Sequence, residues 1–340
     1  MALKYAQWGR VDLSVPMADF LVFNEIAGPF PALGSLSLQV TDRFRPFSDI
    51  QINAVRHSPN LKALQLMDQL CAPTAVDDLA ILPHTLQALR FLHSESAFWE
   101  DFTRIVDHLP HLLHFGTAAY WQPVLNDPRV SASVTSLRVS CERVLDFLTI
   151  PTLEHLHVCL TEEDAPMVNF IAHSQCHLTT LSLEVYEDLS DEAFISSLSA
   201  VDALRTLVLL LPHRGRLNAA RYRLLQRSNV LPQLRVLIIT DLARTPVYEP
   251  FIVLLQARPA LVHAELHMRS WDAFVRRNMP PPPAHVEEEL AALVDRGMTV
   301  RMTTQTYAWP WNAEDGDPVG DLDVDVFGIR HMRPHFFSPF

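Results

Sequence analysis

Apolar residues recur along the chain in a fixed order: one apolar residue, two others, a second apolar residue, one other, and a third apolar residue. The alternation at the end of this pattern predicts a short β-strand with one buried face, because successive side chains of a strand point to opposite sides. Six clear copies are Leu33-Leu36-Leu38, Leu61-Leu64-Leu66, Leu153-Leu156-Val158, Leu178-Leu181-Leu183, Leu204-Leu207-Leu209 and Leu234-Leu237-Ile239. Six looser copies are Trp8-Val11-Leu13, Leu86-Leu89-Phe91, Leu112-Phe115-Thr117, Val134-Leu137-Val139, Leu261-Ala264-Leu266 and Gly297-Val300-Met302.

The segments between these strands carry the signature of helices. Up to Leu261 the copies begin 19 to 30 residues apart, which leaves room for a strand, a turn, a helix and a return loop. Asp164 and Pro166 predict the start of one helix. Two other segments show a single apolar face at helical spacing: Phe98, Phe102, Ile105, Val106 and Leu109, and then Val286, Leu290, Leu293 and Val294 with Gly297 as a C-cap.

The strand pattern is the core of a leucine-rich repeat, and it predicts an α/β fold. One strand-and-helix unit cannot bury its apolar face alone, whereas stacked copies share one continuous core. We therefore expect a right-handed horseshoe solenoid of the ribonuclease-inhibitor type, with one parallel strand per repeat on the concave side and the helices outside. The expected solenoid spans residues 1–303 in about eleven to twelve irregular repeats. Residues 304–340, which combine acidic and aromatic residues, are expected to form a C-terminal cap or tail.

Composition narrows the classes of partner. The chain has 340 residues and a formal net charge of -12, which argues against nucleic acid or an anionic membrane as partner. Its four cysteines show no metal-binding spacing, and no apolar stretch has the length of a signal peptide core or a membrane span. We therefore expect an intracellular protein, cytoplasmic or nuclear, in a reducing compartment.

The sequence holds no motif that predicts an enzyme or a cofactor. With nine glycines, it has no phosphate-binding loop, no dinucleotide fingerprint and no nucleophile elbow. Asp321, Asp323 and Asp325 resemble the start of a calcium loop that lacks its later glycine and glutamate. His108 and His114 flank His111 evenly, but the repeat places these histidines on a helix, a turn and a strand. We predict no catalytic residue, no cofactor and no metal.

Candidate binding residues follow from the repeat frame. If the core residues hold positions one, four and six, then positions three and five point to the concave face, where equivalent residues of neighbouring strands lie side by side. The middle strands predict a cationic zone: Arg90, His114, Arg138, His155 and His157. Later strands predict an apolar zone: Val208, Leu210, Val236 and Ile238. Two alternatives stay open, since the charges suit a solvated surface and the tail or residues 214–229 could cover the apolar zone.

Several phrases of the chain resemble the leucine-rich-repeat region of fungal F-box proteins. They are Trp8–Leu13 near the start, and the phrases Phe30–Leu38, Pro151–Leu156 and Leu231–Leu237, each of which opens a repeat with proline before leucine. The resemblance covers roughly residues 1–303, and its motifs are degenerate. It implies a substrate receptor of a cullin-type ubiquitin ligase, in which the repeats hold a protein substrate and the F-box binds the ligase adaptor.

The sequence departs from that family at its start. An F-box precedes the repeats in the family, whereas seven residues precede Trp8 here. The chain is therefore expected to be either a fragment or a relative that has lost the F-box, and adaptor binding requires an F-box upstream. We predict protein recognition by the concave face, within an F-box-like receptor. The alternative is a stand-alone repeat scaffold or inhibitor unrelated to ubiquitin.

Overall fold

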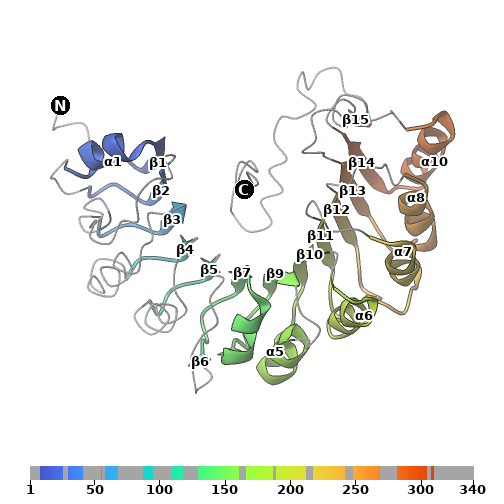
Figure 1. Cartoon of the computed structure of the whole chain (residues 1–340), viewed down its shortest axis with the longest axis horizontal. Coiled ribbons are helices and arrows are strands. Elements are labelled where there is room, and N and C mark those ends of the chain that lie inside the picture. Colours follow the sequence, from blue (N-terminus) through green and yellow to red (C-terminus); the bar gives the residue numbers. More distant parts are fainter. Residues whose placement is uncertain are drawn as a thin grey trace. The chain divides into compact units, whose positions relative to one another are not determined.

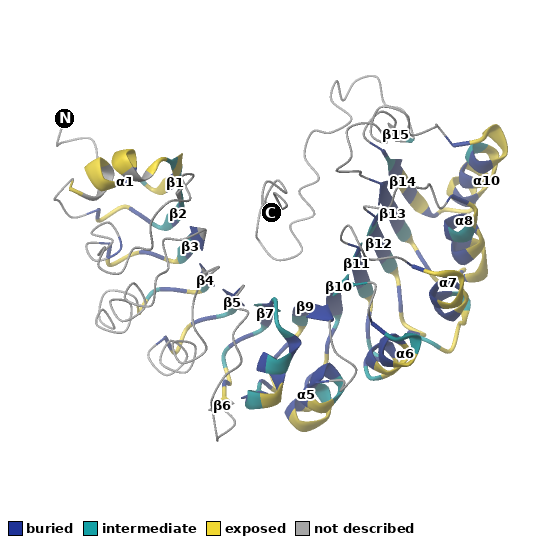
Figure 2. Ribbon diagram, viewed as in Figure 1, coloured by how far each residue is buried: buried dark blue, intermediate teal, exposed yellow. Residues whose placement is uncertain are grey.

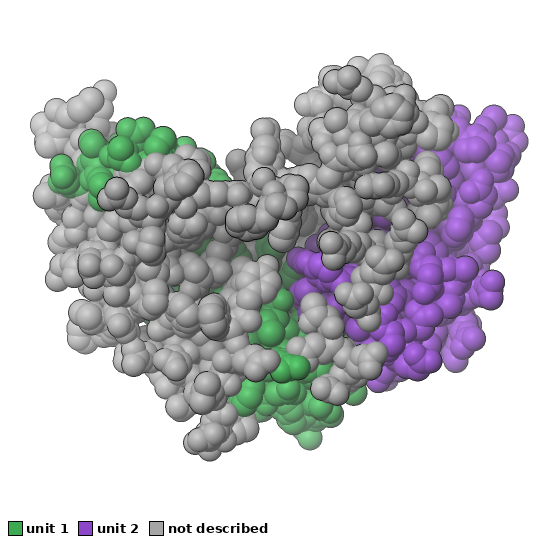
Figure 3. All heavy atoms as spheres, viewed as in Figure 1, with its two compact units in different colours: residues 1–158, 166–177 green, residues 159–165, 178–340 purple. Residues whose placement is uncertain are grey.

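The computed structural model describes most of the strands and helices of the chain and divides it into two compact units. Unit 1 comprises residues 1–158 and 166–177, and unit 2 comprises residues 159–165 and 178–340 (Figure 3). The described residues are 8–25, 30–40, 55, 58–67, 87–94, 109–117, 129–160, 166–186, 189–211, 217–241, 248–268, 282–304 and 308–309.

Unit 1 is built on parallel strands that follow one another in chain order. They are β1 (Arg10–Val15), β2 (Ser35–Val40), β3 (Ala63–Met67), β4 (Phe91–Ser94), β5 (His114–Thr117), β7 (Ser136–Val139) and β9 (His155–Leu160). A second, short parallel pair joins β6 (Arg129–Val130) to β8 (Leu148–Thr149). The helical elements among the described residues of unit 1 are α1 (Met17–Asn24), the 3-10 helix η3 (Glu142–Phe147) and α5 (Pro166–Ser174).

Unit 2 follows the same plan of strands and helices in the part of it that the structure describes. Its strands are β10 (Thr180–Val185), β11 (Thr206–Leu211), β12 (Val236–Asp241), β13 (His263–Met268), β14 (Thr299–Thr303) and β15 (Ala308–Trp309). Its helices are α6 (Asp191–Ser199), α7 (Ala219–Gln226), α8 (Tyr248–Ala257) and α10 (Ala284–Asp295), which lie along one face of the strands (Figure 1). Among the described helices, none combines the length and the apolar character that a membrane crossing requires.

The buried column of the repeat explains why these residues form stacked parallel strands. Leu181, Leu207 and Leu237 pair in register at position four of β10, β11 and β12, and each is at most 1% exposed. Equivalent residues of the other described strands are also buried, and Figure 2 colours much of the strands of unit 2 as buried. Each strand thereby gains a buried face only by stacking on its neighbours. The predicted α/β leucine-rich-repeat fold is confirmed.

A recurring turn leads into many of the described strands. The N–H at position one donates to the carbonyl three residues earlier, as from Leu234 to Leu231 (3.1 Å) and from Leu261 to Arg258 (3.0 Å). The guanidinium of Arg258 is buried and donates to the carbonyl of Leu231 (3.0 Å) and to that of Val230. Leu231 has a φ of 52°, a left-handed conformation that costs energy for a side chain of this size. Arg258 therefore stabilises the turn of the preceding repeat.

A second backbone ladder at position two fixes the strand register. The N–H of Arg90 donates to the carbonyl of Lys62 (2.8 Å), and the N–H groups of Leu113 and His114 both donate to the carbonyl of Arg90 (2.9 Å each). The same pattern joins Arg205 to Arg235 in unit 2, where the N–H of Arg235 donates over 2.8 Å. Arg90 therefore stands at position two of its repeat, before β4 begins.

The register predicted for the fourth repeat is wrong by three residues. The sequence pattern places Leu86, Leu89 and Phe91 in the core, whereas the structure pairs Leu92 with Leu64 at position four. Leu89 and Leu92 are buried at 0% and 1% exposure, and Phe91 is half-buried on the opposite face of the strand. This register fills the column with two leucines and leaves the larger phenylalanine ring outside it.

Two of the predicted helices are confirmed, and one lies outside the described residues. α5 begins at Pro166, and α10 buries Val286, Leu290 and Leu293. Gly297 follows α10 with a φ of 93° and donates its N–H to the carbonyl of Val294 (2.8 Å), as expected of a C-cap. The segment from Phe98 to residue 108 lies outside the described residues.

Among the described strands, β15 differs from the others in direction. β15 pairs antiparallel with β14, through Met302 with Trp309 and Thr303 with Ala308. Because β15 covers the edge of β14, it blocks the backbone groups on which a further parallel repeat would form. Residues 310–340, the rest of the predicted cap or tail, lie outside the described residues.

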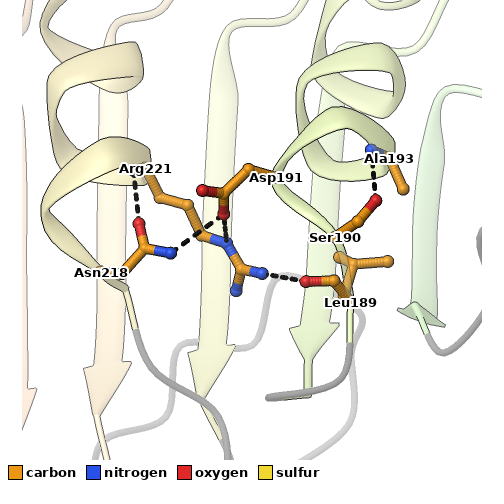
Figure 4. Close-up of polar contacts among 6 residues, drawn as sticks. All are labelled: Leu189, Ser190, Asp191, Ala193, Asn218 and Arg221. Carbon is orange, nitrogen blue, oxygen red and sulfur yellow. Dashed lines mark hydrogen bonds and ion pairs between the residues drawn. The ribbon is translucent and has the colours of Figure 1, made fainter.

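A polar network around the buried Arg221 joins the starts of α6 and α7 (Figure 4). The Nε atom of Arg221 donates to Oδ1 of Asp191 (2.9 Å), and its terminal nitrogen donates to the carbonyl of Leu189. The guanidinium carbon also lies 5.4 Å from the ring centre of Phe194. Asn218 caps α7 by accepting from the N–H of Arg221 (2.8 Å) and donates to Asp191 (3.0 Å). Arg221 is 4% exposed, so this network stabilises the packing of two repeats rather than forming a surface site.

Candidate functional site

The side chains at positions three and five form the face of the strands that points away from the buried column. We call this the open face in each unit. The predicted site residues of the later strands lie on it at their predicted positions, because their register agrees with the repeat frame. Two features of the open face carry chemistry, a basic cluster in unit 1 and a carboxylate–histidine cluster in unit 2.

Four neighbouring strands of unit 1 carry the basic cluster. The register pairs His93 of β4 with Gly116 of β5, Gly116 with Arg138 of β7, and Arg138 with His157 of β9. These residues therefore occupy position five of successive strands, which lie about 4.8 Å apart in a sheet. We define the His–Arg cluster as His93, His114, Arg138, His155 and His157.

Several ring nitrogens of the His–Arg cluster are buried without a hydrogen-bond partner. They are Nδ1 and Nε2 of His93, Nδ1 of His114 and Nδ1 of His155. His93 is 1% exposed, while Arg138 and the two position-three histidines are half-buried. His155 also lies 3.9 Å from the exposed carboxylate of Glu154. A buried polar atom without a hydrogen-bond partner costs free energy, so these nitrogens are unsatisfied in the folded chain.

The electrostatics of the cluster keep its central ring neutral. Burial, the charge of Arg138 and then that of His157 lower the pKa of His93 to about 3. Burial and the charge of His155 lower the pKa of His114. Since an anion would offset the charge of Arg138 and accept hydrogen bonds, it would favour the protonated form of both rings.

The structure places one predicted member elsewhere. Arg90 is exposed and lies at position two, ahead of β4, because the fourth repeat is shifted by three residues. The position-five residue of β4 is His93, which the sequence pattern does not single out. His111 is exposed in the turn before β5, and His108 lies outside the described residues.

The predicted apolar zone of unit 2 is contiguous but only partly accessible. Val208 of β11 and Ile238 of β12 pair directly, and each is 5% exposed. Val236 and Leu210 are half-buried on the same face, and each pairs with a threonine of the neighbouring strand. The accessible part of the zone is therefore formed by Val236 and Leu210.

A carboxylate–histidine cluster lies on β13 beside this zone. Oε1 of Glu265 lies 2.7 Å from Nε2 of His263, and Oε2 lies 2.8 Å from Nε2 of His267. Nδ1 of His267 lies 2.7 Å from Oγ1 of Thr303 on β14. An ionised carboxylate only accepts hydrogen bonds, so each ring must carry a proton on Nε2. His267 thus connects a hydroxyl to a carboxylate in one chain of contacts.

These contacts stabilise the ionised form of Glu265. Burial alone would raise the pKa of Glu265, but the hydrogen bonds and charges of His267 and His263 outweigh it and lower the pKa to about 2. The side chain is 4% exposed. The contact of His267 with Thr303 joins the cluster on β13 to β14, so the cluster favours a role in the pairing of these two strands. Among the residues that the structure describes, no group of three His, Cys, Asp or Glu residues is arranged to hold a metal ion.

Comparison with known proteins gives similarity of fold only. No protein-family model and no curated protein matches the chain. The leucine-rich repeat-containing protein LegL7 from Legionella pneumophila has a similar structure, with 12% identity, a TM-score of 0.45, and coverage of 87% of this chain and 91% of that chain. A Bacteroides fragilis protein gives 13% identity, a TM-score of 0.43, and coverage of 72% and 66%. At this level of similarity neither protein assigns a function to this chain.

Proposed function

We propose that the chain is a protein-recognition scaffold, and that the open face of unit 1 binds an acidic segment of a protein partner. The observation that carries this proposal is the group of buried, unpartnered ring nitrogens beside Arg138. The basic groups of the cluster attract an acidic ligand, and the net charge of -12 repels that ligand from the rest of the chain, so binding is directed to the cluster. Val236 and Leu210 supply an accessible apolar contact on the open face of unit 2.

The proposal predicts an electrostatic binding profile. A fluorescent oligoglutamate peptide should bind the full chain, and Arg138→Glu should weaken binding roughly tenfold or more, as for loss of a charged contact. Raising the ionic strength should weaken binding to the wild type, because salt screens exposed and half-buried charges. Fluorescence anisotropy measured over a salt series provides the test.

A matched variant separates a local effect from a change in net charge. Arg223 is exposed on α7, so Arg223→Glu changes the net charge equally without touching the open face of unit 1. This variant should bind the peptide as the wild type does. Equal losses in both variants, or affinity that ignores salt and Arg138→Glu, would rule out the proposed surface.

The narrower proposal is a substrate receptor of an F-box-like ubiquitin ligase. It is supported by the repeat phrases that resemble fungal F-box proteins, and it places the chain in a reducing, intracellular compartment. The described cysteines, Cys141, Cys159 and Cys176, form no disulfide bond, which suits that compartment. A stand-alone scaffold or inhibitor is the alternative, and a search for an F-box in frame upstream of Met1 in the gene distinguishes the two.

Adaptor binding provides a direct test of this narrower proposal. We expect residues 1–340 alone not to bind the purified ligase adaptor, because we identify no F-box in the printed sequence. Surface plasmon resonance should therefore show no saturable binding at micromolar adaptor. Saturable binding would mean that a divergent F-box lies within these residues, and it would favour the receptor over the scaffold.

A further inference from the structure

His93 is the least accessible member of the His–Arg cluster and the one with most unmet hydrogen-bonding capacity. Its side chain is 1% exposed, and neither Nδ1 nor Nε2 has a hydrogen-bond partner. A neutral imidazole carries one donor and one acceptor, so both are unsatisfied where water does not reach them. Buried polar groups in folded proteins are nearly always paired, which points to a group that completes the ring's hydrogen bonds when bound.

Strand β5, next to β4, leaves space for the imidazole of His93 at Gly116. Gly116 pairs with His93 in the register, and a Cβ atom added to Gly116 would lie 2.3 Å from Nδ1 and 3.2 Å from Cε1 of the imidazole. The ring therefore occupies the space that a side chain at position 116 would fill. Because Gly116 separates β4 from β7, this placement brings His93 toward Arg138 on the open face.

Most of the charged and titratable groups that the described neighbouring strands present around the ring are basic. β5 presents His114, β7 presents Arg138, and β9 presents His155 and His157, while β3 presents the uncharged Gln65 at position five. Glu154 is the acidic group beside the cluster among the described residues; its carboxylate is 61% exposed and lies 3.9 Å from His155. The surroundings of His93 therefore favour an incoming anion and disfavour a cation.

We propose that the His–Arg cluster is a carboxylate-binding site in which His93 takes up a proton from solvent as an acidic side chain of a protein partner binds. The inference rests on the proposed function and assigns its central contact. The carboxylate stays ionised and accepts hydrogen bonds from the guanidinium of Arg138 and from the protonated imidazole of His93. A carboxylate offers two acceptor oxygens in one plane, which suits a guanidinium beside a single N–H donor.

Proton uptake distinguishes this site from simple charge attraction. Without the ligand, burial and the positive charges of Arg138 and His157 lower the pKa of His93 to about 3, so the ring is neutral near neutral pH. A carboxylate offsets these charges and accepts from the ring, which raises the pKa of His93 on binding. Binding must therefore draw a proton from solvent and weaken as the pH rises.

The test is isothermal titration calorimetry of the full chain with an oligoglutamate peptide, in buffers of different ionisation enthalpy at about pH 6.5, near the ordinary pKa of imidazole. The wild type should take up about one proton more per peptide than His93→Gln, and the variant should bind roughly tenfold or more weakly. His111→Gln, which alters an exposed histidine of the turn before β5, should match the wild type in both respects.

Further measurements test the chemistry of the ligand and the position of the His93 imidazole. Oligoglutamine should not bind, and Gly116→Ala should weaken oligoglutamate binding, because the new methyl group displaces the imidazole. Equal proton uptake by the wild type and His93→Gln would overturn the role of His93, even if binding stays sensitive to salt and to Arg138→Glu. Binding of inorganic phosphate without binding of oligoglutamate would overturn the carboxylate assignment. Absence of any salt-sensitive binding would remove the proposed function itself.

Discussion

Replacing Arg221 with alanine is expected to lower the free energy of unfolding by about 3 kcal/mol, the low end of the range for removing one partner of a buried ion pair. The guanidinium is 4% exposed, donates to Asp191 and Leu189, and lies over the ring of Phe194. Alanine leaves the carbonyl of Leu189 without this donor. The low end applies because the side chain of Asp191 is 36% exposed, so water recovers part of the lost interaction.

Urea denaturation of three variants provides the measurement. Arg221→Lys keeps the positive charge but lacks the planar guanidinium. Its free energy of unfolding should therefore fall by less than that of Arg221→Ala. Arg223→Ala, which truncates an exposed arginine of the same helix, should cost less than about 0.5 kcal/mol. A loss in Arg221→Ala no larger than in Arg223→Ala would show that the network does not stabilise the α6–α7 packing.

The fold can be predicted from the sequence because the same pattern of apolar residues recurs in successive repeats. A leucine column such as Leu181, Leu207 and Leu237 needs no knowledge of distant contacts, since each residue packs on the equivalent residue of its neighbour. The C-cap at Gly297 is equally local, because a glycine after the last turn of a helix favours a left-handed backbone. No repeat pattern in the sequence predicts the antiparallel strand β15, since it lies beyond the last of the repeats identified in the sequence.

The fourth repeat shows where the pattern alone is ambiguous. Leu86, Leu89 and Leu92 are three residues apart, so either of the first two leucines can take position one. The turn that precedes other strands resolves the choice: Leu86-Gln87-Ala88-Leu89 aligns with Leu109-Pro110-His111-Leu112, in which the last leucine is position one. If the fourth repeat is aligned on this turn sequence, His93 rather than Arg90 lies on the open face.

The carboxylate–histidine cluster was missed for a different reason. The repeat frame considers positions three and five, which include His263 and Glu265, but His267 stands at position seven of the same strand. A strand places every second side chain on one face, so the alternation of His263, Glu265 and His267 is the available signal. Its contact with Thr303 depends on the register between β13 and β14 and is not readable from one strand.

Replacing Glu265 is expected to produce the clearest pH-dependent loss of stability. The pKa of Glu265 is about 2 in the folded chain, below the ordinary value of 4.5, because the two histidines outweigh the effect of burial. A carboxyl whose pKa is lowered by folding stabilises the folded state fully above its unfolded pKa. This contribution is lost as the pH falls from about 4.5 through about 2. Each hydrogen bond to the charged group is worth about 1.5–3 kcal/mol.

Glu265→Gln retains the shape of the side chain and removes its charge, so it should be destabilised near neutral pH by the loss of at least one such bond. Unfolding of both proteins by urea, followed from pH 7 to pH 3, should show the difference shrinking as the wild-type carboxyl approaches its folded pKa. Glu289→Gln alters an exposed carboxylate that accepts from Gln256 over 2.9 Å, and its effect should be small at every pH. If the difference between the wild type and Glu265→Gln stays constant across this range, the charge of Glu265 does not stabilise the cluster. The cluster would then stabilise these strands by packing alone.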